Sequence, residues 1–224
     1  MLVNGLMALA LAVTPVQAAP AKVDCAKMKC LALTFDDGPG PYTTTLLKTL
    51  KKANAKATFY LVGKSVEKRP EVAAQIVRAG HEVGNHTWSH PSLPAMPDEH
   101  VLGELDSTQQ IIEQATGVRP KTFRPPYGHS DERVLLLAQE LGLAQVKWTD
   151  TTLDWSLRDK DRIRNKVLKL ARPGGVILMH DPVPATVKAM PEVLKELKKR
   201  GYHLVTVSTL LGKRKLAPGE AYPS

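Results

Sequence analysis

The feature that most constrains the fold is a regular alternation of short apolar runs with longer amphipathic segments. The runs at 30–35 (CLALTF) and 176–179 (VILM) carry no charge, which is typical of buried strands. Between such runs, apolar residues recur at the spacing of a helix, for example at Leu46, Leu47 and Leu50. Parallel strands joined by helices produce this order, so the sequence predicts a parallel sheet covered by helices.

About seven strands are expected, one fewer than the eight of a closed β/α barrel. The predicted fold class is therefore α/β, as a distorted, incomplete (β/α)7-type barrel with parallel strands, and a flat doubly wound sheet is the alternative. The expected strands are 30–35, 58–62, 82–83, 121–123, 144–148, 176–179 and 204–207. The expected helices are 42–53, 70–79, 98–116, 131–141, 159–170 and 190–199.

Composition and charge exclude several classes of protein. With 43% hydrophobic residues the chain can bury a core, unlike a disordered chain, and its 2 cysteines are too few for a disulfide-rich miniprotein. The 31 Lys and Arg residues exceed the 22 Asp and Glu residues, which gives a net charge of +9. Much of the excess lies at 158–172, 195–200 and 213–215. We interpret these segments as solvated helix faces, with attraction to an anionic cell wall as the alternative.

The N-terminus is typical of a secretory signal peptide over residues 1–18. An apolar run at 6–13 is followed by Pro15 and by a possible cleavage pattern that ends at Ala18. The segment lacks the usual Lys or Arg, and a membrane anchor is the alternative, but the run is shorter than the ~20 residues of a bilayer span. The rest is expected to divide into an N-terminal tail at 19–28, one domain at 29–211 and a flexible tail at 212–224.

The cysteines Cys25 and Cys30 are expected to form a disulfide, because an exported chain folds in an oxidising compartment. No Cys or His lies close to them in the sequence to complete a metal site. The disulfide would tie the N-terminal tail to the first strand.

Ionisable residues follow the expected strands at the ends where active sites form. In parallel β/α folds, the carboxyl ends of the strands meet at one rim and carry the functional residues. Five separate segments of this chain deliver polar groups to that rim, which is hard to attribute to chance. These residues are Asp36, Asp37, His86, His90, Arg124, Tyr127, Asp154, His180 and Asp181.

His86 and His90 are the strongest candidates for metal ligands. Four residues apart, they would share one face of a helical turn. With a carboxylate from the same rim they would form a site of two His and one Asp with open positions, which suits Zn²⁺ in a hydrolase or Fe²⁺ in an oxygenase. Further acid and base residues at the rim favour hydrolysis.

Each of the other rim residues has a structural interpretation as well. Of Asp36 and Asp37, one could bind a cation while the other accepts a proton. Alternatively, since Gly-Pro follows them, they could form an Asx turn. Arg124 could orient a carboxylate or lie on the surface, and His180 could be an ordinary core histidine. Asp154 could raise the pKa of His180 if the two are adjacent.

Together these segments resemble the polysaccharide deacetylase family, the NodB-homology domain of carbohydrate esterase family 4. The resemblance covers residues 29–211 and rests on five ordered motifs. They are TFDDGP at 34–39, HTWSH at 86–90, RPPY at 124–127, Asp154-Trp155, and LMH at 178–180. It implies a distorted β/α barrel.

The resemblance assigns the metal and the base. Asp37, His86 and His90 would bind one divalent metal ion, usually zinc. Asp36 would be the general base that activates the attacking water, and Arg124 would position Asp36. Asp36 is therefore expected to be needed for turnover and not for metal binding.

The resemblance also assigns the acid and the substrate contacts. His180 would be the general acid, supported by Asp154, and the backbone N–H of Tyr127 would stabilise the oxyanion. The residues next to the substrate would be Tyr127, Pro125, Trp155 and Leu178. One motif departs from the family pattern: an acidic residue often stands three positions before the Asp-Trp pair, where this chain has Thr151, with Asp150 one residue earlier.

The implied activity is removal of N-acetyl groups from GlcNAc-containing polysaccharide, either chitin oligomers or peptidoglycan. The alternatives are an O-acetyl esterase acting on acetylxylan and an inactive carbohydrate-binding barrel. The expected protein is a bacterial monomer, secreted or associated with the cell wall, with no membrane span in its mature form. Its expected partner is the N-acetylated polysaccharide. Nucleic acid is not expected for an exported chain with 5% aromatic residues.

Overall fold

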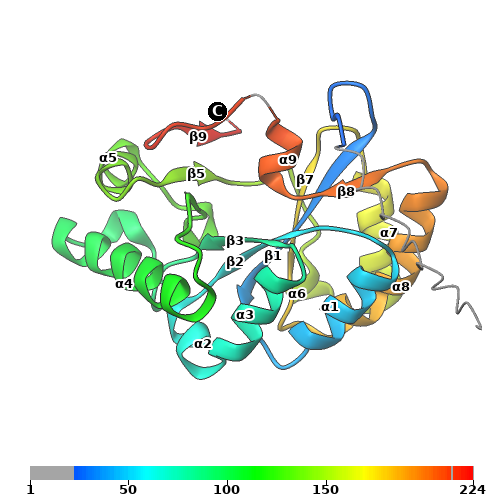
Figure 1. The fold of residues 1–224 in the computed structure, drawn as a ribbon, viewed down its shortest axis with the longest axis horizontal. Coiled ribbons are helices and arrows are strands. Elements are labelled where there is room, and N and C mark those ends of the chain that lie inside the picture. The colour runs from blue at the N-terminus through cyan, green and yellow to red at the C-terminus, as the bar shows by residue number, and fades with distance from the viewer. Residues whose placement is uncertain (1–22, 213, 224) are drawn as a thin grey trace, which may run out of the picture.

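Nine strands form one curled, open sheet in the computed structural model, which describes residues 23–212 and 214–223 (Figure 1). The order is β6-β7-β1-β2-β3-β4-β5-β9, with β8 paired to the start of β1, and every pairing is parallel. The strands are β1 (Cys30–Gly38), β2 (Thr58–Leu61), β3 (Glu82–Asn85), β4 (Thr122–Phe123), β5 (Ala144–Val146), β6 (Asp150–Thr151), β7 (Val176–His180), β8 (His203–Val205) and β9 (Ala221–Tyr222). The sheet is thus an incomplete barrel, as the sequence predicts, since the described strands β6 and β9 end the row without pairing to each other.

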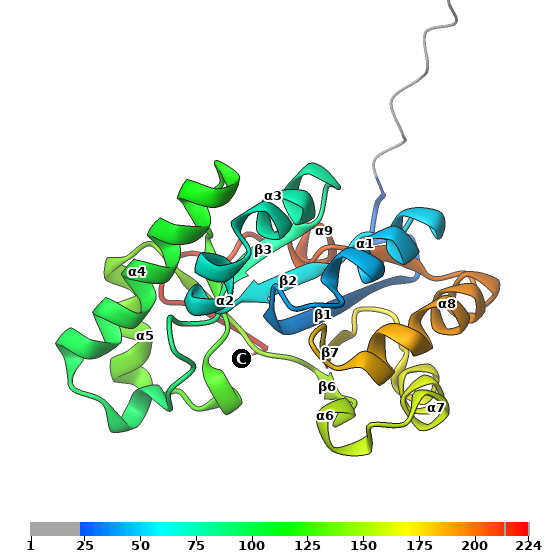
Figure 2. The same ribbon diagram turned by 90° about the horizontal axis from the view of Figure 1, so that it is seen from below.

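A row of helices covers the sheet. Neighbouring helices pack in the order α7, α8, α1, α3, α4 and α5, which follows the order of the strands (Figure 2). The helices are α1 (Thr43–Lys52), α2 (Gly63–Lys68), α3 (Pro70–Arg78), α4 (Asp98–Thr116), α5 (Glu132–Glu140), α6 (Asp154–Leu157), α7 (Lys160–Leu170), α8 (Pro184–Lys199) and α9 (Val207–Leu211). Every described helix is too short or too polar to span a bilayer.

The central strand β1 separates an apolar core from a polar interior. Successive side chains of a strand point to opposite faces. Leu31, Leu33 and Phe35 enter the large cluster of buried apolar side chains beneath the helices. The alternate residues Thr34 and Asp36 face the inside of the curled sheet, where both are buried and both contact Arg124. One strand thus anchors the core and delivers a carboxylate to the interior.

The N-terminal predictions have different outcomes. Cys25 and Cys30 form the expected disulfide, which ties the segment before β1 to its first residue. The predicted signal peptide at 1–18 lies outside the described residues.

Several elements differ from the expectation. Helix α8 begins at Pro184 rather than at residue 190, and Pro191 lies inside it. The short elements α2, α6, β6 and β9 were not predicted, because a few residues carry too little periodicity to be recognised. The flexible tail predicted for 212–224 is wrong for Ala221–Tyr222, which pair with Gln145 and Val146 of β5.

Candidate active site

The carboxyl ends of β1, β3 and β7 surround a cavity of about 490 Å³. Six of the nine candidate rim residues line it directly: Asp36, Asp37, His86, His90, Tyr127 and His180. Arg124 and Asp154 are fully buried behind this layer and reach the cavity only through the residues that they contact. The segments that the sequence predicts at one rim are therefore brought together.

A bulge in β1 lets two consecutive aspartates face the same cavity. Asp36 pairs with Tyr60 and Gly38 with Leu61, which leaves Asp37 as an extra residue in the strand. Asp37 has a φ of 71°, in the left-handed region. In a regular strand Asp36 and Asp37 would point to opposite faces, but a bulge re-aims one side chain. Both carboxylates consequently line the cavity.

Asp36 is held by the guanidinium of Arg124. Nη1 of Arg124 donates to Oδ1 of Asp36 at 2.8 Å and to the Thr34 hydroxyl at 2.7 Å. Nε donates to the Val146 carbonyl at 3.0 Å and Nη2 to the Lys147 carbonyl at 2.7 Å. The guanidinium carbon also lies 4.1 Å from the centre of the Tyr60 ring. A cation bonded on all sides in this way can hold Asp36 in one orientation.

The tautomer of His86 is fixed by the backbone of Arg124. Nδ1 of His86 lies 2.6 Å from the Arg124 carbonyl oxygen, which can only accept, so Nδ1 carries the proton. Nε2 is then the free nitrogen, 3.5 Å from Oδ1 of Asp37 and 3.7 Å from Oδ2 of Asp36. This is the arrangement found around metal-binding histidines, in which one ring nitrogen is hydrogen-bonded and the other is available.

His90 is brought to the site by a loop. The expectation that His86 and His90 share a helical turn is wrong, because the chain after β3 is irregular and Thr87 and His90 have φ values of 65° and 64°. The loop is held by its neighbours: the Thr87 N–H donates to the Asn85 side chain, and the N–H and hydroxyl of Ser89 donate to Glu104. The left-handed residues turn His90 back so that its Nε2 lies 3.4 Å from Oδ1 of Asp37.

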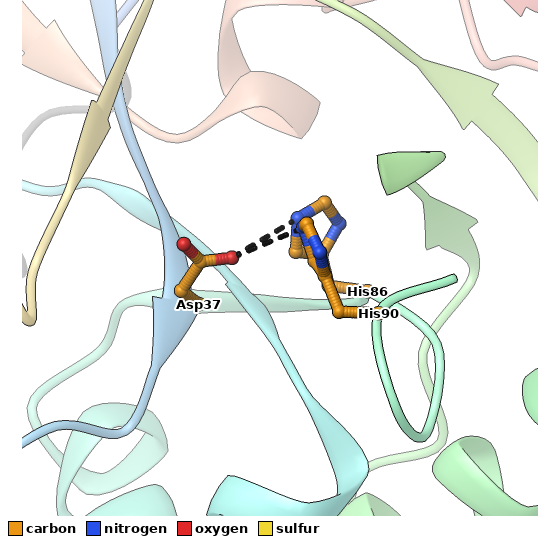
Figure 3. Close-up of side chains that lie close together, drawn as sticks. All are labelled: Asp37, His86 and His90. Atoms are coloured by element: carbon orange, nitrogen blue, oxygen red, sulfur yellow. Dashed lines mark ion pairs between the residues drawn. The ribbon is translucent and has the colours of Figure 1, made fainter. Parts of the chain in front are cut away.

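Asp37, His86 and His90 fit a divalent metal ion. One ligand atom from each lies within 4.8 Å of the others, and both imidazoles turn a nitrogen toward the same carboxylate oxygen (Figure 3). That oxygen, Oδ1 of Asp37, is buried without a hydrogen-bond partner among the described residues. Burial alone would raise the pKa of Asp37, but His86, with His180 and His90, brings it down to about 2. The carboxylate is therefore ionised, and a bound cation would take the place of the missing hydrogen-bond donor.

His180 and Asp154 form a second polar pair at the cavity, and His180 of β7 lies beside Asp36 of β1. Nδ1 of His180 lies 2.8 Å from Oδ1 of Asp154. The other oxygen of Asp154 accepts from the His180 backbone N–H at 2.8 Å and from the Thr186 hydroxyl at 2.6 Å. Burial alone would lower the pKa of His180, but Asp154, with Asp36 and Asp37, raises it to about 9. His180 is thus a protonated imidazolium near neutral pH.

The walls of the cavity are largely apolar. Of the predicted substrate contacts, Tyr127, Trp155 and Leu178 line it, whereas Pro125 is buried and lies outside the lining. Sequence reasoning missed five lining residues, which are Trp148, Thr151, Leu153, Pro182 and Val183. The position of Trp148 at the end of an expected strand, and of Pro182 and Val183 just after His180, could have identified three of them.

Thr151 takes the place of the expected acidic residue at the cavity. Asp150 turns away from it, and its carboxylate accepts from the Arg172 guanidinium at 2.9 Å. The support of His180 therefore comes from Asp154 and Thr186, both of which are buried.

Comparison with known sequences places the chain beside a group of enzymes. The family model described as polysaccharide deacetylase matches residues 24–146. Peptidoglycan-N-acetylglucosamine deacetylase PgdA of Listeria monocytogenes is 40% identical over 195 residues, which are 87% of this chain and 41% of that protein. Peptidoglycan-N-acetylmuramic acid deacetylase PdaC of Bacillus subtilis is 40% identical over 183 residues, 81% of this chain and 38% of that protein. Chitin deacetylase 1 of Cryptococcus neoformans is 34% identical over 214 residues, 85% of this chain and 46% of that protein.

The chain thus spans less than half the length of these three relatives. Among solved structures, T48 deacetylase with substrate superposes with a TM-score of 0.86 at 41% identity, covering 89% of this chain and 99% of that one. BA3943 of Bacillus anthracis, described as a CE4 family pseudoenzyme, has a TM-score of 0.79 at 30% identity, covering 88% of this chain and 70% of that one. Proteins with this fold therefore include an inactive one, and activity depends on the residues of the site.

Proposed function

Because the chain belongs to the polysaccharide deacetylase family, we propose that it is a metal-dependent hydrolase that removes N-acetyl groups from GlcNAc-containing polysaccharide and releases acetate. One observation carries the proposal: a cluster suited to a metal and a protonated histidine line the same cavity. Hydrolysis of an amide needs both, since its carbonyl is a weak electrophile and its amine a poor leaving group.

The metal proposed for the cluster is zinc. Two imidazole nitrogens and one carboxylate oxygen are ligands that Zn²⁺ takes in catalytic sites, where a further position stays open. A cation bound there would polarise the acetyl carbonyl and lower the pKa of a water molecule to roughly 7. Asp37, His86 and His90 would hold the ion, each through the atom that faces the other two.

Asp36 is proposed as the general base. Its Oδ2 is turned toward His86 and the cavity, while Oδ1 is bonded to Arg124. One oxygen is thus held in place and the other is free to take a proton from the attacking water. Arg124 acts through Asp36 and is a positioning residue.

His180 is proposed as the general acid that protonates the leaving amine. Its Nδ1 is bonded to Asp154, so Nε2 is the nitrogen left to donate toward the cavity. The backbone N–H of Tyr127 is proposed to donate to the oxyanion. Tyr127 has a left-handed φ of 59° and lines the cavity, whose apolar wall at Leu178 suits the acetyl methyl group.

The acid pair favours an amide substrate over the ester of the alternative hypothesis. An alkoxide leaves without full protonation more readily than an amide nitrogen, so an esterase depends less on a strong general acid. Asp154 is fully buried and spends both oxygens on His180, Thr186 and the backbone, which supports a firmly held acid. The inactive barrel is disfavoured because the metal, base and acid residues are all in place.

Peptidoglycan is proposed as the polymer, because the two relatives at 40% identity are both named for it. Chitin oligomers are the second candidate, named by the relative at 34% identity. A protein acting on peptidoglycan must reach the cell wall, which agrees with the expected signal peptide. We propose a secreted or wall-associated bacterial monomer.

Acetate release from peptidoglycan, chitopentaose and acetylxylan tests the proposal, with and without a chelator. We expect release from peptidoglycan or chitopentaose at a rate well above that from acetylxylan, abolished by the chelator and restored by zinc. The Asp36→Asn variant is the matched control, since it removes the base and conserves the shape of the side chain. Faster release from acetylxylan would establish the esterase, and no release from any substrate with zinc supplied would establish a binding barrel.

A further inference from the structure

Two adjoining cavities lie at the amino ends of the strands, away from the active site. One has a volume of about 410 Å³ and the other about 560 Å³, and they share Asn54, Ala55 and Lys56 as wall residues. Lys56 precedes β2, and its backbone N–H donates to the Leu204 carbonyl of β8. Leu204 pairs with Leu31 at the start of β1, whereas Asp37 lies at the other end of that strand. Six residues of strand separate the two levels, which is roughly 20 Å.

The walls of these cavities carry cations and no carboxylates. Lys51, Lys56 and Arg78 line the first cavity, and Lys198 joins Lys56 in the second. No Asp or Glu is found among the described residues that line either cavity. These four side chains also take part in no ion pair within 23–212 and 214–223, unlike Arg164 and Arg200 on neighbouring helix faces. The two adjoining cavities together, called the groove below, therefore hold positive charge that the described chain does not neutralise.

The neutral groups in the first cavity include donors. The Ala57 N–H donates to Nδ1 of His81 at 3.2 Å, so the proton of the neutral ring lies on Nε2. Burial, with the charge of Lys56, lowers the pKa of His81 to about 4, which keeps the ring neutral. The side-chain oxygen of Gln75 accepts from Thr44 at 3.4 Å, so its amide hydrogens remain available. Donors therefore accompany the cations, as an oxyanion requires.

Compensation of helix dipoles explains only part of this arrangement. Lys51, Arg78 and Lys198 lie in the last turns of α1, α3 and α8, where cations are favourable, and Lys56 donates to the Ala79 carbonyl just after α3. One cation at each helix end is enough to compensate the dipole of that helix. Helices α3, α1 and α8 pack side by side (Figure 2). The cations at their three ends therefore line two adjoining cavities, with no Asp or Glu among the described lining residues.

We propose that this groove binds a phosphate-bearing polyanion, at a site separate from the catalytic cavity. A phosphate group offers more acceptor oxygens than a carboxylate, in keeping with the guanidinium of Arg78 and several lysines. A linear polymer fits better than a single ion, because Arg78 lines one cavity and Lys198 the other. The groove would hold the enzyme on an anionic matrix while the opposite rim remains free to act. This goes beyond the proposed function and does not depend on it.

Binding of inorganic polyphosphate to the full chain tests the groove. Lys51→Gln combined with Arg78→Gln removes two cations from it, and Lys68→Gln combined with Arg162→Gln removes two exposed cations that line neither cavity. We expect the dissociation constant to rise about tenfold for the groove variant at low salt and less than about twofold for the control. Added salt should weaken wild-type binding and reduce the difference between the variants.

Four results would overturn the proposal: no binding of polyphosphate by the wild type, equal weakening in both double variants, equally tight binding of poly-glutamate, or a lower melting temperature in the groove variant without any loss of affinity. The last result would leave only a helix-capping role. If the double variant does not fold, Lys198→Gln alone provides the same test in the second cavity. There we expect a rise of about threefold in the dissociation constant, and an unchanged constant would equally overturn the groove.

Discussion

The catalytic cavity holds two sets of residues that satisfy their polar atoms in different ways. In the acid–base set, Arg124 has protein partners for Nε, Nη1 and Nη2, and Asp154 accepts three hydrogen bonds. In the metal set, Oδ1 of Asp37 has no hydrogen-bond donor among the described residues, and the Nε2 atoms of His86 and His90 lie within 3.5 Å of it. The first set keeps its geometry by itself, whereas the second is complete only when something binds.

This difference separates two kinds of functional residue. Buried polar groups are ordinarily hydrogen-bonded, so an unsatisfied carboxylate oxygen between two imidazole nitrogens indicates a ligand site. A fully bonded group such as Arg124 indicates a residue that orients another. Variants in the two sets should therefore fail differently, by loss of metal in the metal set and by loss of turnover with the metal retained in the acid–base set.

The largest effect is expected from Asp37→Asn, in the metal set. An amide removes the charge that holds the cation between His86 and His90, so zinc binding should be lost and acetate release should fall by at least about a thousandfold. Zinc content per chain and turnover are the measurements. Asp150→Asn is the matched control, because Asp150 bonds Arg172 outside the cavity. This variant should keep both its zinc content and its turnover. Full zinc content in Asp37→Asn would remove the distinction between the two sets.

The next effect is expected from Asp36→Asn, in the acid–base set. Loss of the general base should reduce turnover by about 10² to 10⁴. Zinc content should stay at the wild-type level, because Asp36 is bonded to Arg124 and is not one of the three clustered ligands. A near-wild-type rate would show that Asp36 is not the base, and lost zinc would make it a ligand.

Asp154→Asn should change the pH dependence of turnover. The general acid must be protonated, so activity falls as the pH rises through the pKa of His180, which Asp154 helps to hold near 9. Removing that charge lowers the pKa, and the alkaline limb of the kcat profile should move to lower pH by about one unit or more. Asp161→Asn, an exposed acid on α7, should leave the limb in place. An unmoved limb in Asp154→Asn would exclude His180 as the acid.

The smallest effect is expected from the loop that carries His90. Ser89→Ala removes the hydroxyl bond to Glu104 at 2.6 Å, so the loop should hold His90 less firmly. Since the bond is exposed, the affinity for zinc should fall only about threefold, as a competition titration can measure. Ser107→Ala, on the exposed face of α4, is the control and should bind as the wild type does. A loss of zinc affinity as large as that in Asp37→Asn would mean that the loop is only marginally ordered.

The sequence predicts the main elements because their periodicity is long enough to be recognised. Helices such as α4 and α7, and apolar runs such as β7, are found near their expected ranges. The two-residue strands β6 and β9 carry no periodic signal and are absent from the predicted strands, although β4, of the same length, is among them. The predicted start of helix α8 at residue 190 lies six residues after its start at Pro184 in the structure, where Pro191 is accommodated inside the helix although proline disfavours a helix interior.

For the site, the sequence predicts which residues meet and not how they meet. The rim of a parallel sheet collects residues from the ends of its strands, which accounts for Asp36, His86 and His180. The bulge at Asp37 and the left-handed turns at Thr87 and His90 depend on the packed structure, and spacing alone favoured a helical turn for the two histidines. The free oxygen of Asp37 could be recognised only once the burial and partners of each atom were known.

The most direct test of the account is a crystal structure of the zinc-loaded protein with anomalous data collected at the zinc edge. We predict one ion at the catalytic rim, bound by Oδ1 of Asp37 and by Nε2 of both His86 and His90, with Nδ1 of His86 still bonded to the Arg124 carbonyl. Zinc bound elsewhere with this cluster left empty, or bound through Nδ1 of His86, would contradict it.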